Sequence, residues 1–457
     1  MTTDMHGKNV LVVGLGKSGV ASALFLQSRG ARVTVSDAKS QQQLQDEIPA
    51  LLEKGITVET GRHGERTFRN QDLIVVSPGV PTNLPQLAEA RREGTPVIGE
   101  IELAARFLEG QIVAITGSNG KTTTTTLTGE VIAAGGCKTL VGGNIGTPAI
   151  SFVDHSSPDT WIVLEISSFQ LETIETFRPH IAAILNFSPD HLDRHGSMAN
   201  YFAAKARIFE NQNANDFAVL NADDEQTAAL ASALRPQVYW FSRRREVERG
   251  AFVRNDQIVF RDQHGQRSVM SCADITLKGA HNLENVLAAV AMGSLAGIEA
   301  AKMRTAVKDF KAVEHRLEFV ATIAGVDYYN DSKATNVDAT IKALEAFAGG
   351  IHIILGGKDK GSDYSALNRL LRERVRRVYT IGAASSKIES QIANSVPVIS
   401  SGTLGEALRI ASGNARAGEI VLLAPACASF DQFTSYEERG RVFKAEVRAL
   451  QAHAGGR

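Results

Sequence analysis

The chain has 457 residues, 43% of them hydrophobic and 22% charged, and its formal net charge at pH 7 is −1. This near-neutral balance argues against a nucleic-acid partner, because such a partner requires a basic face. The three cysteines are too few and too scattered for a disulfide framework or a zinc site, which fits a reducing compartment. No apolar run approaches the roughly 18 residues of a membrane span, and the first eight residues lack the apolar core of a signal peptide. We therefore expect a soluble, cytoplasmic protein without a membrane partner, built from roughly three domains of about 150 residues each.

Residues 1–99 carry the alternating pattern of a βαβ unit. Small residues at 19–27 predict a helix, and short apolar runs predict strands at 9–13, 32–37 and 73–76. The block ends near 97–100, just before a helix expected at 101–107. Asp37 ends the second of these strands, and the turn after the first is a complete G-x-G-x-x-G, formed by Gly14, Leu15, Gly16, Lys17, Ser18 and Gly19. This pattern is typical of a diphosphate bound at a helix N-terminus, with the acid near a ribose. The alternative is that the glycines serve only the close packing of a tight turn.

A second phosphate-binding pattern follows the apolar strand expected at 112–116. This strand leads into a glycine-rich turn and a helix start that read Gly117, Ser118, Asn119, Gly120, Lys121, Thr122 and Thr123. The glycines let backbone amides face phosphate oxygens, the lysine adds a positive charge, and the Thr122 hydroxyl is a ligand for Mg²⁺. Ile115 stands where the general G-x-x-x-x-G-K-[ST] pattern has its first glycine, so the loop is a shortened variant. The sequence predicts triphosphate binding here, against the alternative of an ordinary turn with a solvated lysine.

The apolar runs after this loop predict a parallel sheet buried on both faces, with further strands at 161–166, 181–186 and 217–221. Residues 237–275 alternate over short stretches, which predicts a small antiparallel part before a helix at 282–295. Glu165 ends a strand where a carboxylate ligand of Mg²⁺ belongs, although a surface acid fits the same pattern. Taken alone, the sequence favours a capping or hydrogen-bonding role for His191 and a solvated helix position for Lys205.

From residue 313 a third series of strands alternates with helices, at 326–330, 351–355, 375–381, 396–399 and 420–424. Lys333 and Lys360 follow the first two strands, and the carboxyl ends of parallel strands are where ligands bind. These loops predict an anionic ligand or a reacting phosphate, unless they are ordinary charged turns. Cys427 has small apolar neighbours and no evident base, so we do not expect a nucleophile there. The predicted fold is α/β with three domains, at 1–99, 100–312 and 313–457.

Together these motifs resemble the Mur ligase family over essentially the whole chain. Beyond the two phosphate loops, the resemblance is carried by residues 143–146, 165–170, 190–193, 203–207, 279–285, 315–316, 331–336 and 425–433. It implies a Rossmann-like N-terminal domain for a UDP-linked substrate, a central P-loop ATPase-like domain, and a Rossmann-like C-terminal domain for an amino acid. The last of these segments is similar to that of the member that adds D-glutamate. The resemblance therefore implies an ATP-dependent ligase of peptidoglycan precursor synthesis, which joins D-glutamate to UDP-N-acetylmuramoyl-L-alanine through an acyl phosphate.

The resemblance also implies a role for each motif residue. The UDP-linked substrate would contact residues 14–19, Asp37, Ser77, Pro78, Gly79 and Asn144. ATP would contact residues 117–123, Asn282, Asn285, His315, Arg316, Asp331 and Lys333. Two Mg²⁺ ions would be held by Thr122, Glu165, His191 and Lys205, the last as a carbamate formed with CO₂. D-Glutamate would contact Lys360, Ser429 and the backbone of Phe430. The residues implied in catalysis are Lys121, Asn144, His191, Lys205 and Lys333, and we expect a monomer.

Two other functions explain part of the pattern. A nucleotide-sensing protein would use residues 14–19 for NAD and the second loop as a switch, and would hydrolyse its nucleotide slowly without a second substrate. A folylpolyglutamate synthase-like ligase would share the last two domains but would leave the unit at 14–37 unexplained. Lys358 stands where some Mur ligases have an acid, so the sequence around the expected D-glutamate site departs from the family pattern.

Overall fold

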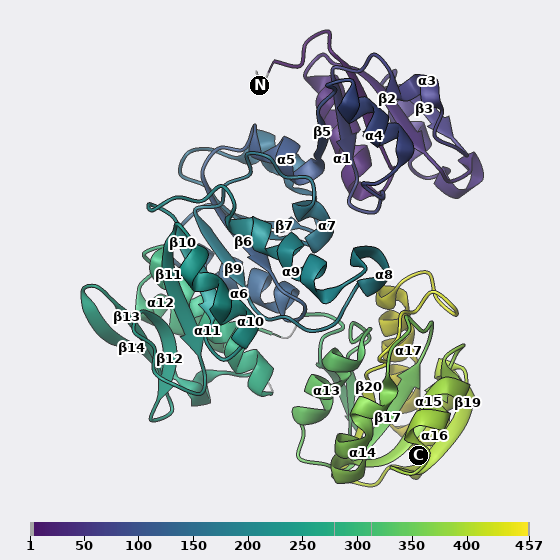
Figure 1. Ribbon diagram of the computed structural model, residues 1–457. Helices are drawn as coiled ribbons and strands as arrows, with labels where there is room; N and C mark the ends of the chain where they lie inside the picture. Colours follow the sequence, from purple (N-terminus) through teal and green to yellow (C-terminus); the bar gives the residue numbers. More distant parts are fainter. Residues whose placement is uncertain (1–3, 278, 312, 456–457) are drawn as a thin grey trace. The chain divides into compact units, whose positions relative to one another are not determined.

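The computed structural model describes residues 4–277, 279–311 and 313–455 (Figure 1). Its contacts divide the chain into two compact units. The first unit comprises 1–187, 195–271 and 286–307, and the second comprises 188–194, 272–285 and 308–457. Of the predicted domain limits, the one between 99 and 100 lies within the described residues, whereas residue 312 and the two ends of the chain lie outside them. Three sheets make up the α/β architecture, two in the first unit and one in the second.

The first sheet has five parallel strands in the order β3-β2-β1-β4-β5. Its strands are β1 (Asn9–Val13), β2 (Arg32–Asp37), β3 (Thr57–Thr60), β4 (Leu73–Val76) and β5 (Val97–Gly99). The predicted strands are confirmed because their apolar runs are buried on both faces, as Val10 to Val13 of β1 are. The edge strand β3 was not predicted. The helices of this part are α1 (Lys17–Ser28), η1 (Gln41–Leu44), α2 (Ile48–Glu53), α3 (Glu65–Phe68), α4 (Pro85–Arg92) and α5 (Glu100–Ala105).

The second sheet has nine strands in the order β14-β13-β12-β11-β10-β9-β6-β8-β7. From β7 to β12 neighbouring strands are parallel, and β12 to β14 are antiparallel. The antiparallel part predicted at 237–275 is therefore confirmed, and it continues the central sheet through β11. The strands are β6 (Gln111–Thr116), β7 (Thr139–Gly143), β8 (Trp161–Glu165), β9 (Ile181–Ile184), β10 (Phe217–Asn221), β11 (Gln237–Ser242), β12 (Gly250–Arg254), β13 (Gln257–Asp262) and β14 (Gly265–Ser271).

The helices that follow the strands of the second sheet include long α6, α11 and α12 and several single turns. Their bounds are α6 (Lys121–Ala134), η2 (Ala149–His155), α7 (Ser168–Leu171), α8 (Leu192–His195), α9 (Met198–Ala206), η3 (Arg207–Phe209), α10 (Glu225–Leu230), η4 (Ala231–Ala233), η5 (Cys272–Asp274), α11 (Ala280–Leu295) and α12 (Ala300–Asp309). The N-terminus of α6 directly follows the glycine-rich turn after β6, which sets the phosphate loop at the carboxyl end of a central strand.

The third sheet lies in the second unit and has six strands in the order β15-β16-β20-β17-β18-β19, of which only β15 is antiparallel to its neighbour. The strands are β15 (Glu318–Ile323), β16 (Val326–Asn330), β17 (Ile351–Gly356), β18 (Val375–Ile381), β19 (Val398–Gly402) and β20 (Ile420–Leu423). Its helices are α13 (Val337–Glu345), η6 (Tyr364–Leu367), α14 (Asn368–Arg374), α15 (Ser385–Ile392), α16 (Leu404–Asn414) and α17 (Tyr436–Gly455). Because β16, β20 and β17 are parallel neighbours, the loops that follow them meet at one edge of this sheet.

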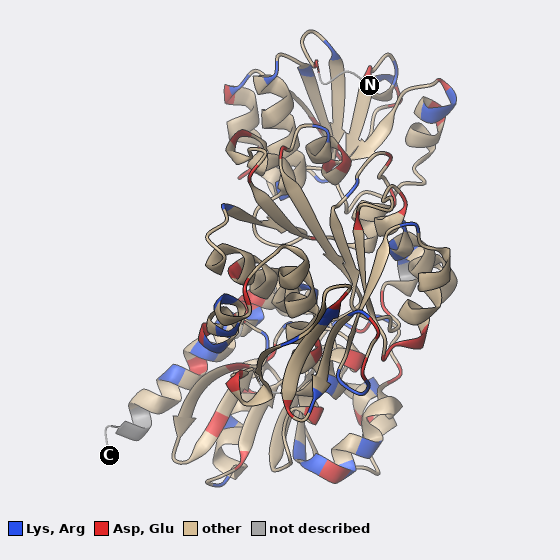
Figure 2. Ribbon diagram, turned by 90° about the vertical axis from the view of Figure 1, so that its left-hand side faces the viewer, with Lys and Arg blue, Asp and Glu red and all other residues tan. Residues whose placement is uncertain are grey.

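Charged side chains of both signs are interspersed along the helices and loops, whereas the strands carry few (Figure 2). The last helix, α17 (Tyr436–Gly455), carries both basic and acidic residues along its length. This distribution agrees with the small net charge of the sequence. Within the described ranges, no helix combines the length and the apolar character that a membrane crossing requires.

Candidate active site

The first group of predicted residues surrounds the turn between β6 and α6. Gly117 and Gly120 adopt φ angles of 151° and 82°, which residues with a Cβ rarely adopt. Lys121 folds back over the turn, where its Nζ donates hydrogen bonds to the carbonyl oxygens of Gly117 at 3.0 Å and Ser118 at 2.9 Å. Thr123 follows in the first turn of α6 and is buried. The turn therefore combines a helix N-terminus with a lysine, as an anion site requires.

Three predicted residues form one hydrogen-bonded chain beside this turn. The hydroxyl of Thr122 donates to Glu165 Oε2 at 2.7 Å, and the amide of Asn144 donates to Glu165 Oε1 at 2.9 Å. The backbone N–H of Asn144 also donates to the Glu165 carbonyl oxygen, at 2.8 Å. Glu165 is buried, so the alternative of a surface acid is wrong. A hydroxyl and a carboxylate held together are oxygen donors of the kind that Mg²⁺ prefers.

Lys205, on α9, is only 2% exposed, so the alternative of a solvated helix lysine is wrong as well. Its Nζ donates to Thr116 Oγ1 at 3.3 Å and to the Gly117 carbonyl oxygen at 2.8 Å, and it lies 4.8 Å from the centre of the Tyr201 ring. Lys121 and Lys205 thus donate to the same carbonyl oxygen. Because each Nζ lies within hydrogen-bond distance of that oxygen, the two nitrogens are at most about 6 Å apart.

The turn after β1 forms a second group in the first unit. Gly14 has a φ of 93°, and a Cβ on Gly19 would lie 1.8 Å from the Gly14 carbonyl oxygen, so close packing requires both glycines. The Ser77 hydroxyl donates to the same carbonyl oxygen at 2.8 Å. Asp37 accepts hydrogen bonds from the N–H groups of Leu15 and Lys39, at 2.6 and 2.8 Å. The structure therefore brings together the glycine turn, Asp37 and the segment that contains Pro78 and Gly79.

Residues after Gly16 also contribute to a cavity beside the first helix. The cavity has a volume of about 690 Å³ and is lined by Lys17, by apolar residues of α1, and by residues of η2 and the loop before it. Ser18 is partly buried at the start of α1.

The remaining predicted residues belong to the second unit. His191, with a φ of 52°, has its Nε2 3.5 Å from Asp190 Oδ2, and Asn336 Nδ2 donates to the same oxygen at 3.4 Å. In the first turns of α11, Asn285 Nδ2 donates to Asn282 Oδ1 at 3.0 Å. Within the second unit, the structure therefore groups His191 with Asp190 and Asn336.

His315, Arg316 and Asp331 come together at the carboxyl end of β16. The N–H of Leu317 donates to Asp331 Oδ1 at 3.3 Å, and the N–H of Lys333 donates to the His315 carbonyl oxygen at 3.2 Å. Burial raises the pKa of Asp331 to about 7, while the charge of Arg316 acts in the opposite direction. This carboxyl therefore exchanges its proton near neutral pH.

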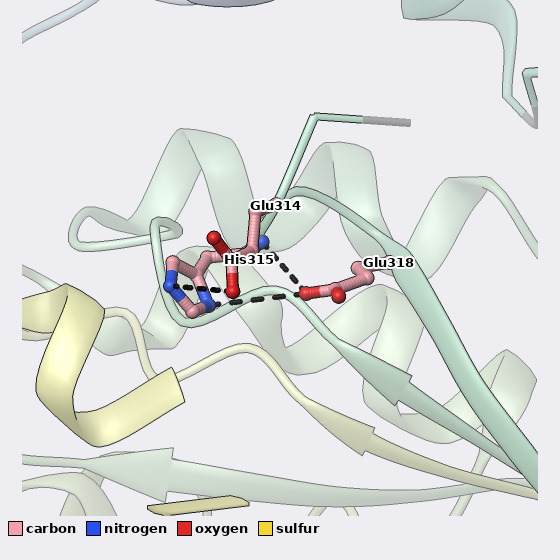
Figure 3. Close-up of side chains that lie close together, drawn as sticks. All are labelled: Glu314, His315 and Glu318. Carbon is pink, nitrogen blue, oxygen red and sulfur yellow. Dashed lines mark hydrogen bonds and ion pairs between the residues drawn. The ribbon is translucent and has the colours of Figure 1, made fainter. Parts of the chain in front are cut away.

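His315 is surrounded by a network that the sequence did not reveal (Figure 3). The His315 ring lies 3.8 Å from a carboxylate oxygen of Glu314 and 3.8 Å from one of Glu318. The backbone N–H of His315 donates to Glu318 Oε2 at 2.9 Å. Asn330 Nδ2 lies 2.9 Å from His315 Nδ1. Burial lowers the pKa of His315 despite both acids, which favours the neutral ring at pH 7.

The side chains of Glu314, His315 and Glu318 lie close enough together to hold a metal ion. However, Lys444 of α17 pairs with both acids, with a separation of 2.9 Å from Glu318 and a hydrogen bond to Glu314. An ammonium group already pairs with both carboxylates, so the cluster is better described as a network that fixes the loop containing Arg316. The sequence alone does not reveal this network, because Lys444 is far from both acids along the chain.

Lys333, predicted for the transferred phosphate, and Lys360, Ser429 and Phe430, predicted for D-glutamate, lie in the three loops at the edge of the third sheet. Lys333 Nζ is 3.8 Å from the centre of the Tyr436 ring. Lys360 is exposed, Ser429 is buried, and Phe430 is 67% exposed. The lysine is thus open to a ligand, as is the ring of Phe430.

Arg439, which the sequence did not single out, connects two of these loops. Its guanidinium is 1% exposed and donates to Ser332 Oγ at 2.9 Å, to the Ser332 carbonyl oxygen at 2.8 Å and to the Cys427 carbonyl oxygen at 3.2 Å. Burial lowers its pKa to about 10, so the group keeps its charge at neutral pH. The sequence predicts a surface position for an arginine in an amphipathic helix. Only the structure shows that Arg439 joins the loops of Ser332 and Cys427.

Three domain models of one family match the chain: the Mur ligase MurD-like N-terminal domain at residues 8–99, the Mur ligase middle domain at 115–293, and the Mur ligase glutamate ligase domain at 315–427. The chain therefore belongs to the Mur ligase family. The UDP-N-acetylmuramoylalanine--D-glutamate ligase of Koribacter versatilis is 66% identical to it, over 98% of each chain. The enzyme of the same name from Acidobacterium capsulatum is 59% identical, over 99% of this chain and 98% of the relative.

Solved structures support the same fold at lower identity. A pseudomurein peptide ligase type C from Methanothermus fervidus superposes with a TM-score of 0.62 at 19% identity, over 97% of this chain and all of that one. The UDP-N-acetylmuramate-alanine ligase of Thermotoga maritima gives a TM-score of 0.59 at 19% identity, with the same coverage. The predicted three-domain α/β fold of a Mur ligase is thus confirmed.

Proposed function

We propose that this chain is an ATP-dependent ligase that joins D-glutamate to UDP-N-acetylmuramoyl-L-alanine in peptidoglycan precursor synthesis. The observation that carries the proposal is the convergence of Lys121, Thr122, Asn144, Glu165 and Lys205 around one phosphate loop. The names and high identity of the full-length relatives support the choice of substrates. Domain limits at 1–99, 100–312 and 313–457, a cytoplasmic location and a monomeric state are parts of the same proposal.

In this proposal the phosphates of ATP bind at Gly117, Ser118, Asn119, Gly120, Lys121, Thr122 and Thr123. The amides of the turn and the N-terminus of α6 favour negative charge, and Lys121 adds a point charge beside it. Thr122 and Glu165 hold one Mg²⁺, which neutralises phosphate charge when it is bound. The adenosine part is assigned to Asn282, Asn285, His315, Arg316 and Asp331.

Lys205 is proposed to act as a carbamate that, with His191, holds a second Mg²⁺. The neutral amine attacks the carbon of CO₂, an N–C bond forms while one C–O π bond opens onto oxygen, and one N–H proton passes to solvent while the other stays on nitrogen. The product is an anion with two oxygen donors, which suits Mg²⁺ better than an ammonium group does. Its burial and its place beside Gly117 support this assignment, because the carbamate would face the phosphate loop.

The UDP-linked substrate is assigned to the first sheet. Residues 14–19 offer the N-terminus of α1 to the diphosphate, and Asp37 and residues 77–79 border the same turn. Asn144 is assigned to the reacting carboxylate, because its amide already donates to the Glu165 carboxylate. In the second unit, Lys360, Ser429 and the backbone of Phe430 are assigned to D-glutamate.

The reaction then proceeds in two displacements. A carboxylate oxygen of the alanyl group attacks the γ-phosphorus of ATP, the bond to ADP breaks, and an acyl phosphate forms. Lys121 and Lys333 are assigned to stabilise the transferred phosphate. The amine of D-glutamate then attacks the acyl carbon, the C–O bond to phosphate breaks, and the amide forms with loss of a proton. No nucleophilic side chain is required, which agrees with the buried, unactivated Cys427.

The test is phosphate release from ATP by the purified chain with combinations of acceptor and amino acid. We expect release that requires both UDP-N-acetylmuramoyl-L-alanine and D-glutamate, together with a product of the corresponding mass. Release that instead requires L-alanine or L-glutamate, or that needs no second substrate, would contradict the proposal.

A further inference from the structure

The loop that carries Lys360 is organised by an aspartate next to it. Asp359 Oδ1 accepts a hydrogen bond from the N–H of Ser362 at 3.1 Å, which closes a tight turn over Lys360 and Gly361. Gly361 has a φ of 80°, the left-handed conformation that such a turn requires. Lys360 is therefore at the tip of a turn whose shape depends on the Asp359 carboxylate.

The same carboxylate is held from two further directions. Tyr364 Oη donates to Asp359 Oδ1 at 2.8 Å, and Lys387 Nζ lies 2.7 Å from Asp359 Oδ2. Although burial acts in the opposite direction, the hydrogen bonds from Lys387, Tyr364 and Ser362 keep the pKa of Asp359 below its ordinary value. Asp359 is thus ionised at neutral pH and paired with Lys387, which leaves the neighbouring Lys360 for another anion.

The network continues into the loop that carries Ser429. Tyr364 Oη lies 2.9 Å from Cys427 Sγ, and burial raises the pKa of this thiol to about 11. Because the tyrosine proton is donated to Asp359, the protonated thiol donates to the tyrosine oxygen. The hydrogen bonds therefore run in one direction, from Cys427 through Tyr364 to Asp359. Tyr364 is fully buried, so water does not compete for its hydroxyl.

A second link joins the same two loops. Lys358 and Ala428 exchange two backbone hydrogen bonds, of 2.8 and 3.1 Å. Gly357 permits this approach, because a Cβ there would lie 2.2 Å from the Ala428 carbonyl oxygen. With one link at Lys358 and another through Tyr364, the two loops have little freedom to shift relative to each other.

We propose that Asp359, Tyr364 and Cys427 are positioning residues that fix the spacing between Lys360 and Ser429, and so determine the length of the acidic amino acid that the site accepts. The inference rests on the proposed D-glutamate site and goes beyond it by naming what makes the site selective. None of the three side chains is required to touch the substrate. The network acts through the geometry of the two loops alone.

The test compares Tyr364→Phe with Tyr379→Phe. Tyr379 is also a fully buried tyrosine of the third sheet, and its hydroxyl lies 2.9 Å from His352 Nδ1, away from both loops. Both variants remove one buried hydroxyl, so their loss of stability should be similar. We expect only Tyr364→Phe to raise the KM for D-glutamate, by about three- to tenfold, with kcat and the KM for ATP within about twofold of wild type. We also expect its preference for D-glutamate over D-aspartate to fall.

Asp359→Asn provides a second variant, because it keeps the size of the side chain and leaves Tyr364 in place. It should raise the KM for D-glutamate at least as much as Tyr364→Phe does, since both the turn and the Lys387 pair weaken. An unchanged KM and selectivity in folded Tyr364→Phe and Asp359→Asn would overturn the inference, as would an equal change in Tyr379→Phe. The proposed function is tested separately, on the wild-type protein: it would be wrong if wild type required an amino acid other than D-glutamate.

Discussion

Glu100 provides a sharp test of how the first sheet is attached to the rest of the first unit. It is the first residue of α5, directly after β5, and its Oε1 accepts a hydrogen bond from the N–H of Ile150 in η2 at 2.8 Å. Burial raises its pKa from 4.5 to about 7, although hydrogen bonds from Ile150, Ala149 and Gln170 act in the opposite direction. The carboxyl is only 2% exposed, so solvent screens it little.

The direction of the pH dependence follows from this pKa. The folded state binds the proton more tightly than the unfolded state, so the stabilisation from Glu100 is complete below about pH 4.5 and is lost as the pH rises through about 7. A rise from 4.5 to about 7 corresponds to about 3 kcal/mol, at about 1.4 kcal/mol per pKa unit. Glu100→Gln keeps the acceptor oxygen and removes the ionisation. It should therefore be more stable than wild type at pH 8 to 9, by up to about 3 kcal/mol.

Hydrogen exchange of the peptide that contains Ile150, corrected for the intrinsic exchange rate, measures this local free energy of opening. Glu102, on the same turn of α5, provides a control because its pKa is shifted in the opposite direction. It accepts hydrogen bonds from Thr176 and from the N–H groups of residues 175–177, which lower its pKa although burial acts in the opposite direction. Glu102→Gln should therefore destabilise at neutral pH and matter less in acid. Wild-type protection of Ile150 that does not change between pH 5 and 9 would refute the reasoning.

Substitutions at three further positions test the site and its support. Lys205→Ala should lower the rate of ligation by about 100-fold or more, and small carboxylic acids should restore part of it; full activity without them would rule out the carbamate. Glu165→Gln should reduce kcat by about 100-fold and raise the Mg²⁺ concentration needed for half-maximal rate, whereas an unchanged Mg²⁺ dependence would remove Glu165 from the metal site. Arg439→Met should lower the free energy of unfolding of the second unit by about 3 kcal/mol in urea denaturation, and Arg439→Lys should recover less than half, because a lysine cannot reproduce the fork of donors.

The sequence predicted the central strands well, because parallel strands that are buried on both faces are continuous apolar runs. β1, β2, β4, β10, β16 and β18 begin and end at the predicted residues. The edge strands β3, β7 and β15 were not predicted, because they are only half-buried and include polar residues such as Thr57 and Glu318. Their position at sheet edges is decided by neighbours that the local sequence does not contain.

The same distinction holds for the site. Residues 117–122 and 14–19 are contiguous motifs, so their spacing alone is enough to predict a phosphate site. Tyr364 and Cys427, by contrast, are 63 residues apart, and their hydrogen bond exists only because β17 and β20 are neighbours. The sequence alone also favoured a solvated Lys205, since helical position does not report burial.

The environment of Lys205 gives a physical reason for its proposed modification. As ammonium groups, Lys205 and Lys121 would repel each other, because both donate to the Gly117 carbonyl oxygen. At about 6 Å and an effective dielectric constant of about 20, that repulsion is about 3 kcal/mol. Conversion of Lys205 to a carbamate reverses its charge, so the same pair would attract each other. A carbamate at Lys205 would thus replace a repulsion between two cations by an attraction, beside the loop proposed to bind the phosphates of ATP.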